Sequence, residues 1–76
     1  MNAVYVSRED QMEELKRSYK YKTMLSVRDL QNIFGWSKSD AYRKIKEGVF
    51  IPFGDIPEGS KKIHKKIVFK YFDSLF

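Results

Sequence analysis

The segment of residues 25–48 constrains the fold of this chain most strongly, because it carries two complete sets of helix boundary signals. Each half opens with a serine, Ser26 or Ser37, and ends at a glycine, Gly35 or Gly48. A serine hydroxyl can accept a hydrogen bond from an unpaired amide of the first helical turn. A glycine can adopt the left-handed conformation in which many helices end. The segment therefore predicts two short helices that are joined by a tight turn.

The apolar residues between these boundaries recur at helical spacing. The predicted inward positions are Val27, Leu30, Ile33 and Phe34 in the first helix, and Ala41, Ile45 and part of Tyr42 in a second helix that runs to Glu47. Trp36, at the turn, is expected to fill the core rather than to stack on a base. The outer side of the second helix is basic. Two short helices with a tight turn and a basic second helix are typical of a helix-turn-helix.

The remaining segments add three predicted elements. Residues 49–53 and 60–63 flank a Gly/Pro-rich loop and predict a β-hairpin, in which Pro52 marks an exposed edge. From about His64 the pattern returns to helix, and its expected inward face is Ile67 or Val68, Tyr71 or Phe72, and Leu75. The predicted fold class is mainly α with a small β-hairpin: a winged helix-turn-helix in residues 25–76, after an N-terminal extension in residues 1–24.

The extension contains one amphipathic helix in this interpretation. Ser7 is its expected N-cap, and an apolar stripe follows at Met12, Leu15 and Tyr19. An isolated helix of about twelve residues is marginal in water, so it should pack either on the domain or on another protomer. The three stripe residues are therefore also candidate oligomer contacts.

Charge is distributed unevenly along the chain. The formal net charge is +5, yet residues 1–24 contain five Lys/Arg and four Asp/Glu, a net of +1. Residues 60–70 contain five lysines and no acid. A basic surface attracts polyanions, above all nucleic acid. The alternative, a lysine-rich face that is merely solvated, stays open for Lys65 and Lys66.

The segment 25–75 resembles the excisionase-like, MerR-type winged helix-turn-helix domains of bacteria and their mobile elements. The resemblance lies in L-S-V-x-D-L from Leu25, in I-F-G-W-S-K-S-x-A-Y-R-K-I-K-E-G up to Gly48, in a proline-containing strand, in a wing that ends in K-K-I, and in a closing helix. It implies either a recombination directionality factor, which assists an integrase in excision, or a small transcriptional regulator. Asp40 departs from the pattern, since related domains usually carry serine or threonine there.

These considerations predict a surface for double-stranded DNA. The expected contacts on the recognition helix are Ser37, Lys38, Ser39, Tyr42, Arg43 and Lys46; those of the wing are Lys61 and Lys62; and further phosphate contacts are Lys44, Lys65 and Lys66. Arg43 is the candidate for direct readout, because its planar guanidinium can grip guanine O6 and N7 together. For Tyr42 a purely core role is equally open.

Other functions find less support in the composition. The chain has no cysteine and a single histidine, His64, so neither a metal centre nor an enzyme is expected, and no cofactor or small-molecule ligand. The longest apolar runs are far shorter than a membrane span, and a cytoplasmic, nucleoid-associated protein is expected. A membrane-surface role for the basic C-terminal helix is a third hypothesis.

Two function classes remain in competition. In the first, the chain is a sequence-specific duplex DNA-binding protein that pairs with itself or with a recombinase on DNA, because one small domain makes few base contacts. In the second, it is a protein-interaction module that binds an integrase or a host factor. Asp40 favours the second class, since a carboxylate on the recognition helix repels phosphate.

Overall fold

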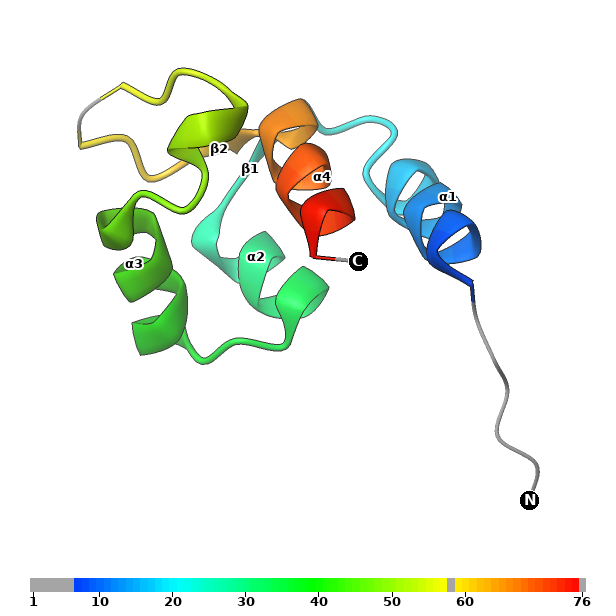
Figure 1. Ribbon diagram of the computed structural model, residues 1–76, viewed down its shortest axis with the longest axis horizontal. Coiled ribbons are helices and arrows are strands. Elements are labelled where there is room, and N and C mark those ends of the chain that lie inside the picture. The colour runs from blue at the N-terminus through cyan, green and yellow to red at the C-terminus, as the bar shows by residue number, and fades with distance from the viewer. Residues whose placement is uncertain (1–6, 58, 76) are drawn as a thin grey trace.

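The computed structural model describes residues 7–57 and 59–75, and this part of the chain is mainly helical (Figure 1). In chain order the elements are α1 (Arg8–Ser18), β1 (Met24–Leu25), α2 (Val27–Phe34), α3 (Lys38–Glu47), the 3-10 helix η1 (Ile51–Phe53), β2 (Ile63–His64) and α4 (Lys65–Ser74). Helix α4 lies centrally, with α1 on one side and the pair α2 and α3 on the other.

The predicted boundaries of α2 and α3 are confirmed. Ser26 and Asp29 form a reciprocal capping box: the Ser26 hydroxyl accepts from the Asp29 amide, and the Asp29 carboxylate accepts from the Ser26 amide at 2.9 Å. Ser37 caps α3 through one hydrogen bond, in which its hydroxyl accepts from the Asp40 amide at 3.1 Å. Gly35 (φ 71°) and Gly48 (φ 79°) both adopt the left-handed conformation that ends each helix.

A small two-stranded antiparallel sheet is present, as the predicted fold class requires, but it is not the expected pairing of residues 49–53 with 60–63. Strand β2 pairs antiparallel with β1, with Leu25 opposite Ile63, and not with residues 49–53. After Gly48 the chain makes consecutive turns, in which the Ile51 amide donates to the Gly48 carbonyl and the Phe53 amide donates to the Phe50 carbonyl. These local hydrogen bonds satisfy the backbone that a strand would have paired. Pro52 fits there because the first turn of a helix needs no amide donor.

The core lies where β1, α2, η1, β2 and α4 meet. The fully buried side chains of greatest volume are Phe50, Leu25, Leu30, Ile63 and Val68. Trp36 stacks on Phe34 with ring centroids 4.4 Å apart, and the Phe50 ring meets Tyr71 edge-on at 4.9 Å. Trp36 packs against this core, as its position at the turn predicts.

Helix α4 presents Val68, Phe69 and Phe72 to the core. The burial of Val68 and Phe72 confirms the predicted inward face. The expectation for Leu75 is wrong: the helix ends one residue earlier, and Leu75 is 55% exposed at its C-cap. Phe69 is a core residue that the periodicity did not single out.

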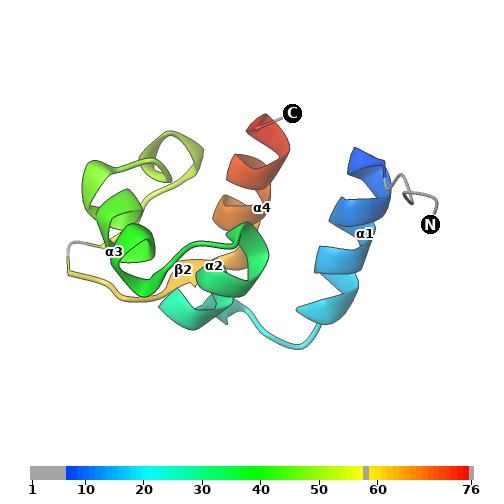
Figure 2. The same ribbon diagram turned by 90° about the horizontal axis from the view of Figure 1, so that it is seen from below.

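Helix α1 lies beside α4 and runs antiparallel to it (Figure 2). Its predicted cap is confirmed, since the Ser7 hydroxyl accepts from the Asp10 amide at 3.1 Å. Met12, Leu15 and Tyr19 are half-buried against the domain's own core. The apolar stripe therefore packs on the domain, which is one of the two arrangements expected for it; its role as an oligomer contact stays a prediction.

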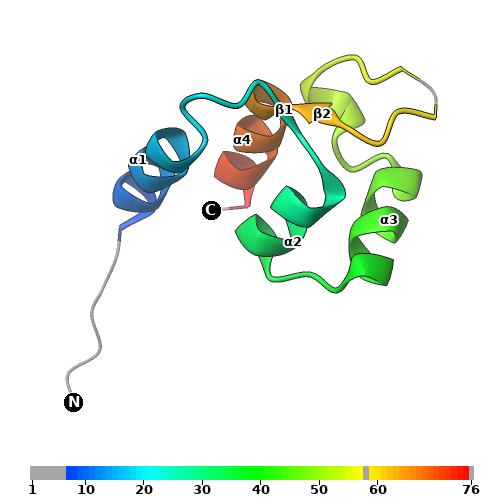
Figure 3. The ribbon, with the colours of Figure 1, turned by 180° about the vertical axis from the view of Figure 1, so that it is seen from behind.

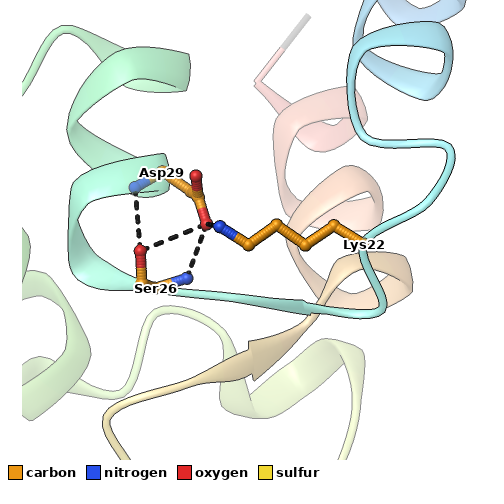
Figure 4. A network of polar contacts seen from close by, with 3 residues as sticks. All are labelled: Lys22, Ser26 and Asp29. Carbon is orange, nitrogen blue, oxygen red and sulfur yellow. Dashed lines mark hydrogen bonds and ion pairs between the residues drawn. The ribbon is translucent and has the colours of Figure 1, made fainter.

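Polar contacts fix the link between α1 and the rest of the fold. The Lys22 ammonium lies 2.6 Å from the Asp29 carboxylate, which also carries the capping-box hydrogen bonds (Figure 4). Burial alone would raise the pKa of Asp29, but the hydrogen bonds from Lys22 and Ser26 outweigh it and hold that pKa below its ordinary value. The pKa of Tyr19 is raised by burial and by the Asp29 charge, against an opposing effect of Lys22.

Candidate nucleic-acid interface

One side of α3 is fixed to the domain and the other is open. Ala41 is fully buried and Ile45 packs against the core, so the helix is held by these two inward positions. The predicted recognition-helix residues all lie on the exposed part of α3 or at its cap: Ser37, Lys38, Ser39, Tyr42, Arg43 and Lys46. We call the last five the α3 outer face. It carries three cations, and all five side chains are accessible to a ligand.

The α3 outer face meets the loop 54–62 along one edge. A groove between them is lined from the helix by Tyr42, Ile45 and Lys46 and from the other side by Ile51, Ile56, Pro57, Gly59, Ser60 and Lys61. Figures 1 and 3 place this loop and α3 at the end of the molecule farthest from α1. The structure thus brings Lys61 together with α3, although the two are far apart in sequence.

Tyr42 lies both on the α3 outer face and in the lining of the groove. It is 41% exposed, yet its ring forms part of the groove wall beside Ile45. A purely core role for Tyr42 is therefore wrong.

The turn that precedes β2 carries Lys61 and Lys62, the two lysines predicted for a wing. The Ser60 hydroxyl donates to the Lys62 carbonyl at 2.7 Å and accepts from the Lys62 amide at 3.3 Å. This local ring of hydrogen bonds fixes the backbone from which Lys61 and Lys62 project. Both side chains are exposed. Two adjacent cations on a fixed turn can meet phosphates without first ordering a mobile loop.

Arg43, on the α3 outer face, forms an ion pair with Asp40. Its Nη2 lies 2.9 Å from Oδ1 of Asp40, one turn earlier, and the two side chains are 62% and 43% exposed. The sequence-based expectation for Asp40 was a repulsive charge, without this ion pair. The signal was present, because residues three apart on a helix are neighbours.

The three further lysines differ in their availability. The Lys44 ammonium lies 6.0 Å from the centroid of the Trp36 ring, in a cation–π arrangement. The Lys44 residue is half-buried. Lys66 is exposed but lines a groove between α1 and α4, together with Met12 and Lys16. It therefore lies apart from the loop and helix that form the groove around Lys61.

Lys65 already has partners within the protein. Its ammonium donates to the carbonyl oxygens of Tyr19 and Lys20, each at 3.2 Å. These carbonyls follow the C-terminal end of α1, where a cation is favoured. A phosphate contact of Lys65 would compete with these two hydrogen bonds, and it stays a prediction.

Neither a cluster of metal-binding side chains nor a membrane-spanning helix is present in the part of the chain that the structure describes. Over residues 7–57 and 59–75, no group of three or more His, Asp or Glu side chains is arranged to hold a metal ion. None of the helices in these ranges has the length and apolar character needed to cross a membrane. What the described surface does offer is a cationic helix face, two adjacent lysines and an apolar groove between them.

Comparison with known proteins adds no assignment. The chain matches no protein-family model, no curated protein and no solved structure. Its function must therefore be argued from the geometry of the α3 outer face and the loop 54–62.

Proposed function

We propose that the protein binds double-stranded DNA through a winged helix-turn-helix, in which α2, the turn at Gly35 and α3 form the helix-turn-helix. The observation that carries this proposal is the division of α3 into two sides. Ala41 anchors one side with no exposed surface, while Lys38, Arg43 and Lys46 stand on the other. A helix with one anchored and one cationic side suits the major groove, which is wide enough to admit it.

The N-terminal end of α3 is expected to meet the DNA backbone. Ser37 is exposed, and its hydroxyl oxygen accepts from the Asp40 amide while its proton stays available as a donor. The first amides of α3 and the positive end of its dipole favour a phosphate at this place. Lys38 adds a positive charge to the same turn. These contacts would set the register of the helix on the duplex.

Base readout is assigned to the middle of α3. Arg43 stands one turn into the helix with its guanidinium exposed, and Ser39 and Tyr42 lie on the same exposed side. A bidentate contact from arginine to guanine contributes about 1–3 kcal/mol of discrimination. We assign Arg43 that contact, and we assign Lys46 to the flanking backbone.

The loop 54–62 acts as the wing in this proposal, although it is not built on a hairpin. Lys61 lines the same groove as Lys46, so the two cations can contact phosphates on either side of one DNA groove. Lys62 extends this contact. The wing contributes affinity that does not depend on sequence, because its partners are phosphates.

The resemblance to excisionase-like domains suggests the biological role. A small DNA-binding protein of this kind would act in the excision of a mobile element, together with an integrase, or as a transcriptional regulator. The few contacts that one such domain can make imply binding beside a second copy or a recombinase. Footprinting on the DNA of the source element distinguishes the roles: tandem sites at an attachment region indicate excision, and a promoter operator indicates regulation.

The direct test is binding of the wild-type protein to random-sequence duplexes at low salt, followed by fluorescence anisotropy. With four to six phosphate contacts, log affinity should fall against log salt with a slope of about −4 to −5. An acidic polypeptide of similar charge density serves as the control polyanion. Absence of duplex binding at low salt rejects the proposal.

One observation favours a protein partner instead. The groove between α3 and the loop 54–62 has an apolar lining that includes Ile45, Ile51 and Ile56. Ile51 is 66% exposed, and an apolar side chain of a partner could cover it. Absence of duplex binding at low salt by a correctly folded wild-type protein would favour this second function.

A further inference from the structure

The ion pair between Asp40 and Arg43 stands in the middle of the proposed DNA surface. Asp40 Oδ1 lies 2.9 Å from Arg43 Nη2, and both side chains are substantially exposed. A pair with this exposure adds little to the stability of the fold, because solvent screens it. A carboxylate at this place also repels the phosphates of a bound duplex. Neither the stability of the ion pair nor affinity for phosphate therefore accounts for a carboxylate beside Arg43.

The pair restricts where the Arg43 guanidinium can go. Arginine has a long side chain with many rotamers, and without a partner it can reach either a phosphate or a base edge. The contact with Asp40 engages Nη2 of the guanidinium and keeps that end of the side chain close to the first turn of α3. The other N–H groups remain free of Asp40, and they include enough donors for O6 and N7 of a guanine.

We infer that Asp40 is a positioning residue that makes Arg43 selective for guanine. This inference rests on the proposed DNA-binding function and deepens it. Asp40 holds the Arg43 guanidinium in the orientation that base readout requires, and it makes the competing contact with a phosphate unfavourable. Asp40 itself need not touch a base. Without Asp40, Arg43 would contribute to the affinity for any duplex; with Asp40, Arg43 contributes a preference for a guanine at one position.

A purely structural role for Asp40 leads to different expectations. An acid in the first turn of a helix stabilises the helix through its dipole, and Asp40 occupies that turn. Such a role would change the melting temperature of the protein, but it would not change which base is preferred at one position. A measurement of base preference therefore distinguishes the positioning role of Asp40 from a purely structural one.

The experiment is selection of bound sequences from a library of random duplexes, with base frequencies read at each position. Four proteins are compared with the wild type: Asp40→Asn, Arg43→Ala, the double variant, and Glu47→Gln as a matched control. Glu47 is an exposed acid at the opposite end of α3. All four must give the wild-type circular dichroism spectrum at the temperature of selection.

The wild type should enrich a motif with one guanine whose preference, roughly 5- to 150-fold, is lost in Arg43→Ala. Asp40→Asn should lower the preference at that same base pair by about two- to fivefold, and leave the other positions unchanged. In the double variant the Asp40 substitution should have no further effect there. Glu47→Gln should reproduce the wild-type motif.

A second readout concerns random duplex. Asp40→Asn should bind it more tightly than the wild type, with a salt slope steeper by about 0.9, because the released Arg43 can neutralise one phosphate. Asp40→Glu retains a carboxylate within reach of Arg43 and should restore most of the guanine preference. An unchanged or sharper guanine preference in Asp40→Asn overturns the inference, as does an equal loss in the Arg43→Ala background. A wild type that binds no duplex overturns the proposed function as well, so the two failures are distinguishable.

Discussion

The side chain of Lys65, the first residue of α4, donates a hydrogen bond to the main-chain carbonyl of Tyr19 at the end of α1, 3.2 Å away. The backbone amide of Lys65 donates to the Thr23 carbonyl at 2.9 Å, so the same residue holds the linker at two points. On the far side of the linker, Lys22 is bonded to Asp29. The link between α1 and β1 is thus held by Lys65 of α4 and by Asp29 of α2. These contacts attach the N-terminal helix to the rest of the fold.

Removal of the Lys65 ammonium should loosen α1 selectively. Lys65→Met keeps the aliphatic stem but loses both hydrogen bonds to α1, and we expect unfolding to become easier by about 1 kcal/mol. Amide hydrogen exchange should accelerate in α1 more than in α2 or α3. Lys62→Met, at an exposed position in the loop 54–62, which lies far from α1 (Figure 1), is the control. Equal exchange in α1 of the two variants would contradict the role given to Lys65.

Asp29 is the most connected polar group of the described fold, and its loss should be costly. The residue is 8% exposed and accepts from Lys22, from the Ser26 amide and from the Ser26 hydroxyl. Asp29→Asn removes the charge that these donors meet, and it should destabilise the protein by about 1–3 kcal/mol in urea denaturation. Asp55→Asn, in the exposed part of the loop, should be close to neutral. A similar effect of both substitutions would refute the assignment.

The lowered pKa of Asp29 also fixes the pH range in which this contribution acts. A carboxyl group whose pKa is lower in the folded than in the unfolded protein stabilises the fold above its unfolded pKa, which is about 3.9. That stabilisation is lost as the pH falls through the folded pKa. The difference in unfolding free energy between wild type and Asp29→Asn should therefore be constant between about pH 5 and 8, and it should shrink below about pH 4. A difference that shrinks near neutrality would point to another group.

Gly54 is required for packing rather than for a special backbone conformation. A Cβ atom at this position would lie 2.6 Å from Cγ1 and 2.7 Å from Cδ1 of Ile67, on α4. Gly54→Ala should therefore destabilise the protein by about 1–3 kcal/mol, through overpacking between η1 and α4. Ile67→Ala should cost less in the Gly54→Ala background than in the wild type, because it removes the clash. Additive effects in thermal unfolding would show that the two residues do not compete for space.

The helix boundaries were predictable because their signals are local. A serine before a helical stripe and a glycine after it lie within a few residues of the backbone groups that they satisfy, as at Ser26 and Gly35. The pairing of β1 with β2 was not predictable in this way, since Leu25 and Ile63 are far apart in sequence, with α2 and α3 between them. Residues 49–53 have the composition of a strand, but the burial of Phe50 and the local turns decide their structure.

The same distinction between local signals and tertiary contacts applies to the candidate site. The exposure of Lys38, Arg43 and Lys46 follows from the period of α3, which the sequence contains. The proximity of Lys61 to α3 and the engagement of Lys65 by α1 are tertiary facts, and no local pattern encodes them. The lysines of residues 60–70 cannot be told apart by their sequence pattern, but the fold places them in different contacts: Lys61 lines the groove beside α3, and Lys65 is hydrogen-bonded to Tyr19.

The wing is expected to supply affinity and no selectivity. Lys61 lines the groove beside Lys46 and has an exposed side chain, so Lys61→Ala should lose one phosphate contact. The salt slope on random duplex should become shallower by about 0.9, and all sequences should be weakened alike. Lys70→Ala, which removes an exposed lysine at the groove between α1 and α4, should leave both the slope and the affinity unchanged. If the two substitutions weaken binding equally, general charge attracts the duplex, and the loop 54–62 has no specific place in the interface.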